Sequence, residues 1–188
     1  HYDDALLYWR QGLDLAKQNG DPNRVLVATQ NLGMLELARG DWETSTKSFL
    51  AALRTGRELG MQDAIAVSLG HLGRLAQYQG RPAAALASFA EALAALRETG
   101  DLRGLAESTL AQAEVDLELG LEKAAGEHLH AAAELLESAP GLTLIAGYGP
   151  TENTTFTCCH VMDGSARLNG SVPIGRPITN TQVYVLDT

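Results

Sequence analysis

Residues 71–92 read HLGRLAQYQGRPAAALASFAEA, and this pattern recurs along the chain with a period of 40 residues. Ahead of the shared glycine at 40, 80 or 120, the copies align Asn31-Leu32-Gly33, His71-Leu72-Gly73 and Ala111-Gln112-Ala113. Behind it, each copy has a small residue, an aromatic or leucine, and an alanine: Ser45, Phe49 and Ala52; Ala85, Phe89 and Ala92; Ala125, Leu129 and Ala132. A half-copy with Ala5, Trp9 and Gly12 precedes them. A fixed period of this length indicates a stack of repeated units.

The units are predicted to be pairs of helices. A glycine falls every 20 residues from Gly20 to Gly120, and between these glycines apolar residues recur at helical spacing. Each glycine can end a helix, because glycine adopts a left-handed backbone at no steric cost. The residues that follow favour a helix start, with Asp21, Asp41 and Asp101 as N-caps and Pro22 and Pro82 in the first turn.

The aligned small residues predict how the helices pack. Gly33, Gly73 and Ala113 let a partner helix approach closely, while Phe49, Phe89 and Leu129 fill the space between one hairpin and the next. One hairpin cannot bury its apolar face alone, so stacked copies share a core. The pattern over residues 1–138 resembles the tetratricopeptide repeat in its 40-residue form. The resemblance implies a mainly α protein, with a solenoid of antiparallel helical hairpins over residues 1–139. In this register the chain starts in the second helix of a repeat, so a further helix is expected upstream.

The resemblance also implies a protein-interaction scaffold, which holds a partner peptide on the concave face formed by the first helices of the hairpins. The positions carried over are Val27, Gln30, Asn31, Met34, Val67, His71, Arg74, Gln77, Tyr78, Glu107, Glu114 and Glu118. Asn31 suits an extended peptide, because its amide both donates and accepts hydrogen bonds. Relatives that grip a C-terminal carboxylate use Lys and Asn one turn apart, and no lysine stands at these positions. The face runs from mixed apolar and polar to acidic, which favours a basic or amphipathic partner.

A second interpretation, in which the same residues have no binding role, stays open. Any of them can be ordinary solvated surface, His71 can be a helix-surface histidine, and Glu114, Asp116, Glu118 and Glu122 can form a solvated face. His128 and His130 are two residues apart, so on a helix they point to different sides and make poor metal ligands. We find no catalytic constellation in this part of the chain.

After about residue 140 the glycine period stops, and residues 140–188 are predicted to form a short β-rich tail. Residues 142–147, 154–161 and 182–186 are expected as strands, with a tight turn at Tyr148-Gly149-Pro150-Thr151-Glu152. A hydroxyl and a carboxylate on such a turn can bind a phosphate oxygen and its Mg²⁺. If unpaired, the tail strands would be exposed edges at which copies of the chain could self-associate.

Residues 141–188 resemble part of the adenylation domain of nonribosomal peptide synthetases, which activate an amino acid with ATP. The resemblance rests on Ala146-Gly-Tyr-Gly-Pro-Thr-Glu152 and on Val172-Pro-Ile-Gly-Arg-Pro-Ile178 with the residues that follow. It implies adenine packing by Tyr148, phosphate contact by Thr151 and Mg²⁺ binding by Glu152. The implied substrate-pocket residues are Gly147, Thr155 and Phe156.

The sequence departs from that family in ways that affect function. Ala146 stands where the family usually has asparagine, and the phosphate loop, the ribose-binding aspartate and the C-terminal catalytic lysine do not occur in these residues. We therefore expect no cofactor for this chain alone, with ATP and Mg²⁺ used only if a complete adenylation domain is assembled. Three hypotheses remain: an interaction module that is not an enzyme, a piece of an adenylating enzyme, and a fusion or fragment without integrated function. Cys158-Cys159-His160 is expected to be plain strand, because neighbours on a strand point to opposite faces.

Composition limits the partners. The formal net charge is −9, and an acidic surface repels phosphate backbones, so nucleic-acid binding is not expected. No apolar run approaches the roughly 18 residues of a membrane span. The two cysteines are adjacent and poorly placed to pair with each other, which favours a reducing, cytoplasmic location.

Overall fold

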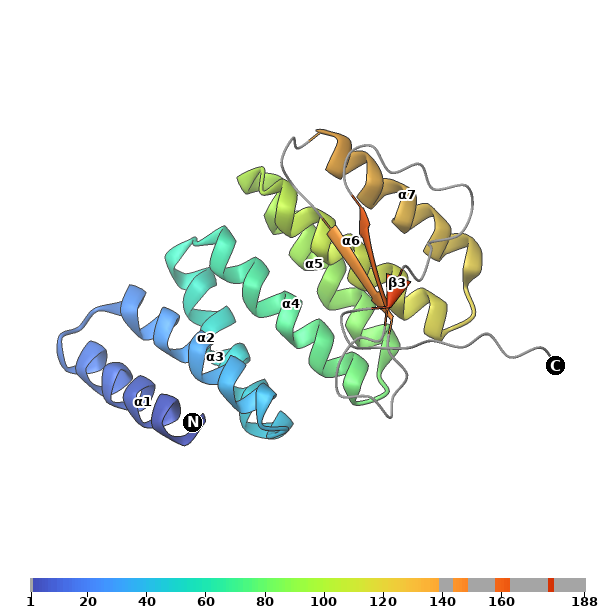
Figure 1. Ribbon diagram of the computed structural model, residues 1–188. Helices are drawn as coiled ribbons and strands as arrows, with labels where there is room; N and C mark the ends of the chain where they lie inside the picture. The colour runs from blue at the N-terminus through green and yellow to red at the C-terminus, as the bar shows by residue number, and fades with distance from the viewer. Residues whose placement is uncertain (1, 139–143, 149–157, 163–175, 178–188) are drawn as a thin grey trace.

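The computed structural model describes residues 2–138, 144–148, 158–162 and 176–177 (Figure 1). The first of these ranges forms seven helices: α1 (Tyr2–Gln18), α2 (Pro22–Ala38), α3 (Trp42–Leu59), α4 (Gln62–Tyr78), α5 (Pro82–Thr99), α6 (Leu102–Glu118) and α7 (Glu122–Ser138). They pair as three antiparallel hairpins, α2–α3, α4–α5 and α6–α7, with α1 packed on α2. The predicted helical-hairpin solenoid is confirmed.

The predicted turns between the helices are also confirmed. All six glycines of the 20-residue series have positive φ, from 62° at Gly20 to 78° at Gly40. At Gly40, the turn is closed by two backbone hydrogen bonds, from Gly40 N–H to the Leu37 carbonyl and from Asp41 N–H to the Glu36 carbonyl, each 2.9 Å long. The side chains of Asp21, Asp41 and Asp101 accept hydrogen bonds from backbone N–H groups three residues on, at 3.0–3.1 Å. Pro22 and Pro82 begin α2 and α5.

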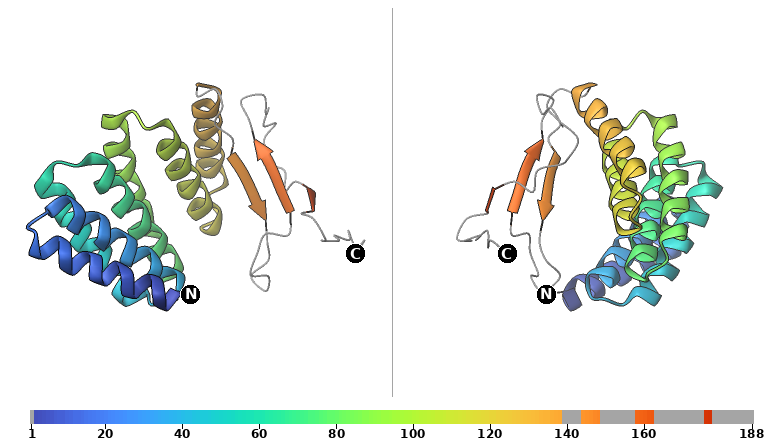
Figure 2. Two further views of the ribbon diagram at one scale, coloured as in Figure 1. Left: turned by 60° about the vertical axis from the view of Figure 1, so that its left-hand side comes forward. Right: turned by 90° about the vertical axis from the view of Figure 1, so that its right-hand side faces the viewer.

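The hairpins stack so that their first helices, α2, α4 and α6, follow one another on one side (Figure 2). We call this side the first-helix face. Helix α2 contacts α4, and α4 contacts α6, so successive hairpins approach each other directly along it. Among the described helices, none combines the length and the apolarity that crossing a bilayer requires.

An aromatic ring lies against a glycine in each of the first two hairpins. Phe49 is 0% exposed and Phe89 is 1% exposed. A Cβ atom added to Gly33 would lie 3.0 Å from Cζ of Phe49, and one added to Gly73 would lie 2.6 Å from Cε1 of Phe89. The predicted close approach at Gly33 and Gly73 is therefore confirmed. Phe89 also packs in one cluster with Ala111 and Val115 of α6, so the ring joins its own hairpin to the next.

Three polar contacts within the hairpins are buried or partly buried. Ser45 Oγ donates to the Gly33 carbonyl at 2.8 Å. The carboxylate of Glu36 accepts from Ser48 Oγ at 2.7 Å, and Asp116 lies 2.8 Å from His128 Nδ1. The interpretation of Asp116 as solvated surface was wrong, because its side chain is only 4% exposed. A buried carboxylate needs such a hydrogen-bond partner to offset the cost of leaving water.

The described part of the tail contains three short strands, β1 (Leu144–Tyr148), β2 (Cys158–Met162) and β3 (Arg176–Pro177). They form an antiparallel sheet in the order β1-β2-β3, with Leu144 opposite Met162 and Cys159 opposite Arg176. These strands coincide in part with those expected at 142–147 and 154–161. The strand expected at 182–186 and most of the tail lie outside the described residues. The β-rich tail as a whole, and the division of the chain at residue 140, remain predictions.

The packing at Gly73 leads to a matched pair of substitutions in α4. Gly73→Ala places a methyl group inside the Phe89 ring's contact distance, and overpacking of this kind costs about 1–3 kcal/mol. Gly70→Ala meets no atom within 4 Å and should instead stabilise the helix by about 0.5–1 kcal/mol. Urea unfolding followed by circular dichroism measures both changes. Equal stability of the two variants would contradict the ring-on-glycine packing.

Candidate partner-binding face

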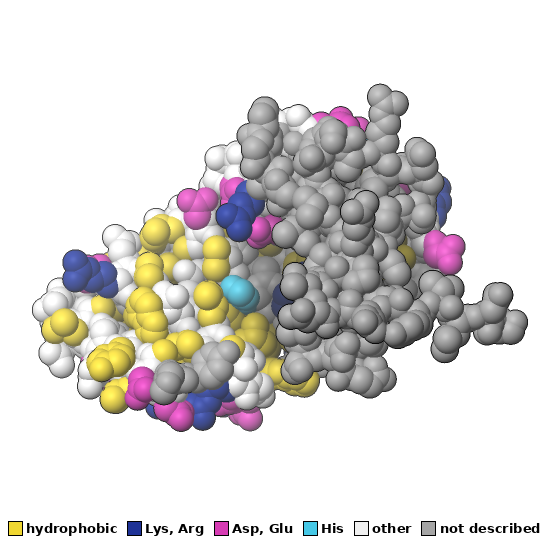
Figure 3. All heavy atoms as spheres, viewed as in Figure 1, with side chains coloured by type: hydrophobic (Ala, Val, Ile, Leu, Met, Phe, Trp, Pro, Cys, Tyr) yellow, Lys and Arg dark blue, Asp and Glu magenta, His cyan; other side chains and the backbone are white. Residues whose placement is uncertain are grey.

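Apolar side chains are exposed on the first-helix face of the first two hairpins. Val27 and Met34 of α2 are 46% and 42% exposed, and Val67 and Tyr78 of α4 are 44% and 55% exposed. The Tyr78 ring stacks on that of Trp42, with the two centroids 6.2 Å apart. Figure 3 shows apolar side chains gathered on the described part of the face in view, with a histidine among them. Exposed apolar side chains gathered on one face are typical of an interaction site.

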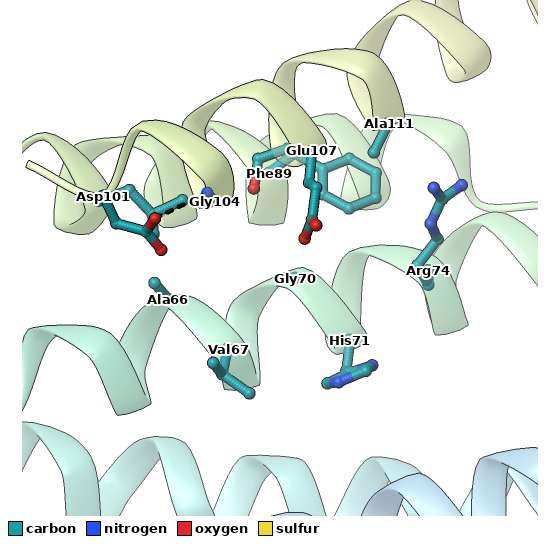
Figure 4. Close-up of a pocket in the computed structure, with 12 residues that line it drawn as sticks. Ala66, Val67, Gly70, His71, Arg74, Phe89, Asp101, Gly104, Glu107 and Ala111 are labelled. Carbon is teal, nitrogen blue, oxygen red and sulfur yellow. Dashed lines mark hydrogen bonds between the residues drawn. The ribbon is translucent and has the colours of Figure 1, made fainter. Parts of the chain in front are cut away.

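A cavity of about 280 Å³ opens between α4 and α6. We call it the α4–α6 pocket. Phe89 and Leu96 of α5 contribute to it from the second helix of the middle hairpin. Figure 4 shows the carboxylates of Asp101, the N-cap of α6, and of Glu107 on α6 extending toward α4, where Ala66 and Gly70 lie. The other residues that line it are Val67, His71, Arg74, Gly104, Ser108 and Ala111.

His71 is half-buried, so it is not merely a surface histidine. Its ring stacks on Phe49, with centroids 4.6 Å apart and planes 17° apart. Burial lowers the pKa of His71 below its ordinary value of 6.5, and the positive charge of Arg74 lowers it further. The neutral form of the ring is therefore favoured in the folded protein.

Several of the predicted partner-binding residues connect neighbouring hairpins. Arg74 forms an ion pair with Glu114 and donates to Gln77 Oε1 at 3.2 Å. Gln77 Nε2 donates to Glu118 Oε1 at 2.7 Å. The contacts of Arg74 with Glu114 and of Gln77 with Glu118 join α4 to α6 along the first-helix face. Partner contact by the same side chains remains a prediction, and the bonds show that their polar atoms already have a structural role.

Gln30 spans the equivalent gap between α2 and α4. Its Nε2 donates to the Ala64 carbonyl at 2.9 Å and to Ser68 Oγ at 3.0 Å. Asn31 donates to the Val27 carbonyl of its own helix at 2.9 Å. Glu107 accepts from Arg103 Nε at 2.9 Å, also within one helix.

The structure brings only some of the predicted residues together. His71, Arg74 and Glu107 line the α4–α6 pocket. Gln30, Asn31 and Met34 lie on α2, whereas Gln77 and Tyr78 lie at the end of α4 and Glu114 lies further along α6. Sequence reasoning missed Gly70 and Gly104, which leave the pocket open. The 40-residue alignment could have found Gly70, because it stands where the previous copy has Gln30.

The residues predicted for nucleotide binding lie almost entirely outside the described part of the chain. Gly147 and Tyr148 end strand β1, while Thr151, Glu152, Thr155 and Phe156 fall outside the described residues. Within the described residues, no group of three or more His, Cys, Asp or Glu side chains is placed to hold a metal ion. The predicted adenylation-type site therefore remains a prediction.

Comparison with known proteins bears on the helical array. The family model of the tetratricopeptide repeat matches residues 24–98. The resemblance to tetratricopeptide repeats is thus confirmed. Aspartyl phosphate phosphatase F from Bacillus subtilis has a similar crystal structure, with a TM-score of 0.72 and 17% sequence identity. That match covers 76% of this chain and 37% of the phosphatase chain, and at this identity it shows the fold alone.

Relatives of a second kind match a shorter part of the chain. A linear gramicidin synthase from Brevibacillus parabrevis is 66% identical over 47 residues, which is 25% of this chain and 1% of the synthase. Surfactin synthase subunit 2 from Bacillus subtilis (strain 168) is 43% identical over 58 residues, which is 31% of this chain and 2% of that protein. These matches confirm the resemblance to a fragment of a peptide synthetase. The chain spans only 1% and 2% of the length of these two relatives.

The lowered pKa of His71 predicts a pH dependence of stability. Because the folded state disfavours protonation, the stabilising contribution of His71 is present above pH 6.5 and is lost as pH falls through the folded-state pKa. His71→Phe keeps an aromatic ring on Phe49 but cannot titrate. We expect the stability of the wild type relative to this variant to fall as the pH is lowered from about 7.5 to about 5.

Urea unfolding across this pH range measures the difference between the two proteins. His130→Gln serves as a control, because the side chain of His130 is 77% exposed. If the difference in the free energy of unfolding between the wild type and His71→Phe does not change with pH, the burial of His71 is contradicted.

Proposed function

We propose that the helical array is a protein-interaction scaffold that binds a partner segment along the first-helix face. The observation that carries the proposal is a change along this face from exposed apolar side chains to acidic ones. Exposed apolar side chains on α2 and α4, such as Val27, Met34 and Val67, give way to the carboxylates of Glu107 and Glu114 on α6. A partner segment complementary to this face has apolar residues at one end and basic residues at the other.

Two further features support the proposal. Stacked repeats present an extended surface formed by equivalent positions of successive units, and such surfaces are used for binding. The apolar side chains of this face stay exposed even though the array has a well-buried core of Phe49, Phe89 and Leu75. Burying them against a partner would contribute about 25 cal/mol per Å² of apolar area.

Selection of peptides from a displayed random library tests the proposal. We expect the recovered sequences to combine apolar residues with a run of Lys or Arg. Val67→Ser should weaken the binding of a selected peptide about tenfold, measured by fluorescence anisotropy. Leu50→Ser is the matched control, since Leu50 is 52% exposed on α3 and Val67 is 44% exposed on α4. Failure to recover any peptide, or equal weakening by both variants, would contradict the proposal.

A second candidate function comes from the peptide synthetase relatives. In this alternative the chain is part of an ATP-dependent enzyme that adenylates an amino acid, and its remaining motifs lie in flanking sequence or in another chain. The 66% identity to a linear gramicidin synthase over 47 residues favours it. Tyr148, Thr151 and Glu152 would then contact ATP and Mg²⁺ in the assembled domain. We propose that the chain on its own does not carry out this reaction.

The exchange of pyrophosphate into ATP separates the two functions. We expect this chain with Mg²⁺ and a mixture of amino acids to give only background exchange, because a lone phosphate-binding turn does not position both substrates. A complete adenylation domain serves as the positive control. Exchange above background that disappears in Glu152→Gln would overturn the proposal and favour the enzyme.

A further inference from the structure

The two gaps between successive first helices are equivalent in the repeat but are filled differently. Between α2 and α4, the side chain of Gln30 crosses the gap and donates to the Ala64 carbonyl and to Ser68 Oγ, at 2.9 and 3.0 Å. Ser68 itself is 0% exposed and donates to the same carbonyl. This gap therefore contains a pair of acceptors satisfied by one side-chain N–H₂ group.

Between α4 and α6, no equivalent side chain crosses the gap, because the position is a glycine. Moving 40 residues along the chain replaces Gln30 by Gly70, Ala64 by Gly104 and Ser68 by Ser108. A Cβ atom added to Gly70 would meet nothing within 4 Å. Gly70, Gly104 and Ser108 all line the α4–α6 pocket of about 280 Å³. The pocket thus occupies the place that the Gln30 side chain fills in the preceding gap.

The charge of the two gaps also differs. Met61 and Val67 stand beside the first gap, and the same positions beside the second are Asp101 and Glu107. Both carboxylates line the pocket and extend toward α4 (Figure 4). Arg74, the basic residue among the lining residues, is already paired with Glu114, and Glu107 is paired with Arg103, which does not line the pocket. A neutral amide suits the first gap, whereas the second favours a positively charged donor.

We propose that the α4–α6 pocket binds one arginine side chain of the partner segment. The guanidinium reaches the Gly104 carbonyl and Ser108 Oγ as Gln30 Nε2 reaches their counterparts, and it contacts the carboxylates of Asp101 and Glu107. Its planar fork of five N–H donors can satisfy several acceptors at once, which the three donors of a lysine ammonium match less well. The methylene stem packs on Ala66 and Val67. This assignment rests on the proposed function and names the partner residue that gives it specificity.

Binding of Nα-acetyl-L-arginine amide, followed by the amide NMR signals of ¹⁵N-labelled protein, tests the assignment. We expect saturable shifts at Gly70, Gly104 and Ser108, with clearly weaker effects from the lysine analogue. The uncharged norleucine analogue should cause no comparable shifts. Equal shifts from the norleucine analogue, or arginine-induced shifts only at exposed acidic residues elsewhere, would overturn the assignment.

Variants of the protein provide the second arm of the test. The side chain introduced by Gly70→Gln should fill the α4–α6 pocket in the way that Gln30 fills the gap between α2 and α4. This variant should therefore abolish the arginine-induced shifts. Gly70→Ala is the matched control and should keep them. Glu107→Gln should weaken binding about threefold to tenfold, a modest loss because the Glu107 side chain is 56% exposed. Asp101→Asn keeps an N-cap for α6 and should also weaken binding. Unchanged binding in Gly70→Gln, with its helical content intact, would overturn the assignment.

The same variants distinguish failure of this assignment from failure of the proposed function. If a library-selected peptide binds wild type and Gly70→Gln equally, and Val67→Ser still weakens it, the first-helix face binds a partner without the pocket. If no peptide binds the wild type, the proposed function itself fails.

Discussion

The contact of the Phe89 ring with Gly73 sets the distance between α4 and α5, and the rest of the array follows from it. A side chain at position 73 would hold the two helices apart, because its Cβ would lie 2.6 Å from Cε1 of the ring. The same contact between Phe49 and Gly33 fixes the previous hairpin. Each ring also reaches the following hairpin, so the internal packing of one unit determines where the next unit sits. Interiors packed to this density transmit such constraints because they leave few voids.

The hairpins pack in the same way, so a position at which the side chain changes from one repeat to the next shows what is particular to that repeat. The contact pair that is Glu36 and Ser48 in the first hairpin becomes Asp116 and His128 in the third, and both pairs are hydrogen-bonded. The gap that Gln30 fills becomes open at Gly70. The backbone is repeated while these side chains are not, so the fold and the chemical character of the first-helix face reside in different positions of the same 40-residue pattern.

The sequence predicted the helices well because their ends depend on local chemistry. A glycine with positive φ and an aspartate that caps the next helix act within a few residues, as at Gly40 and Asp41. The burial of Asp116 was missed because it depends on His128, twelve residues away on the partner helix. The stacking of His71 on Phe49 depends on a contact between hairpins, which periodicity alone does not display. The change from Gln30 to Gly70 is visible in the 40-residue alignment, but the contact that Gln30 makes across its gap is not. The tail differs again, since most of its predicted nucleotide-binding and substrate-pocket residues, those at 151–156, lie outside the described part of the chain.

The most direct test of partner binding on the first-helix face is a crystal structure of the protein with a library-selected peptide. We expect the peptide to lie along α2, α4 and α6, with an arginine side chain between α4 and α6 and its N–H groups at the Gly104 carbonyl and Ser108 Oγ. A peptide bound to the face formed by α3, α5 and α7, or one that leaves the α4–α6 pocket empty, would contradict this expectation.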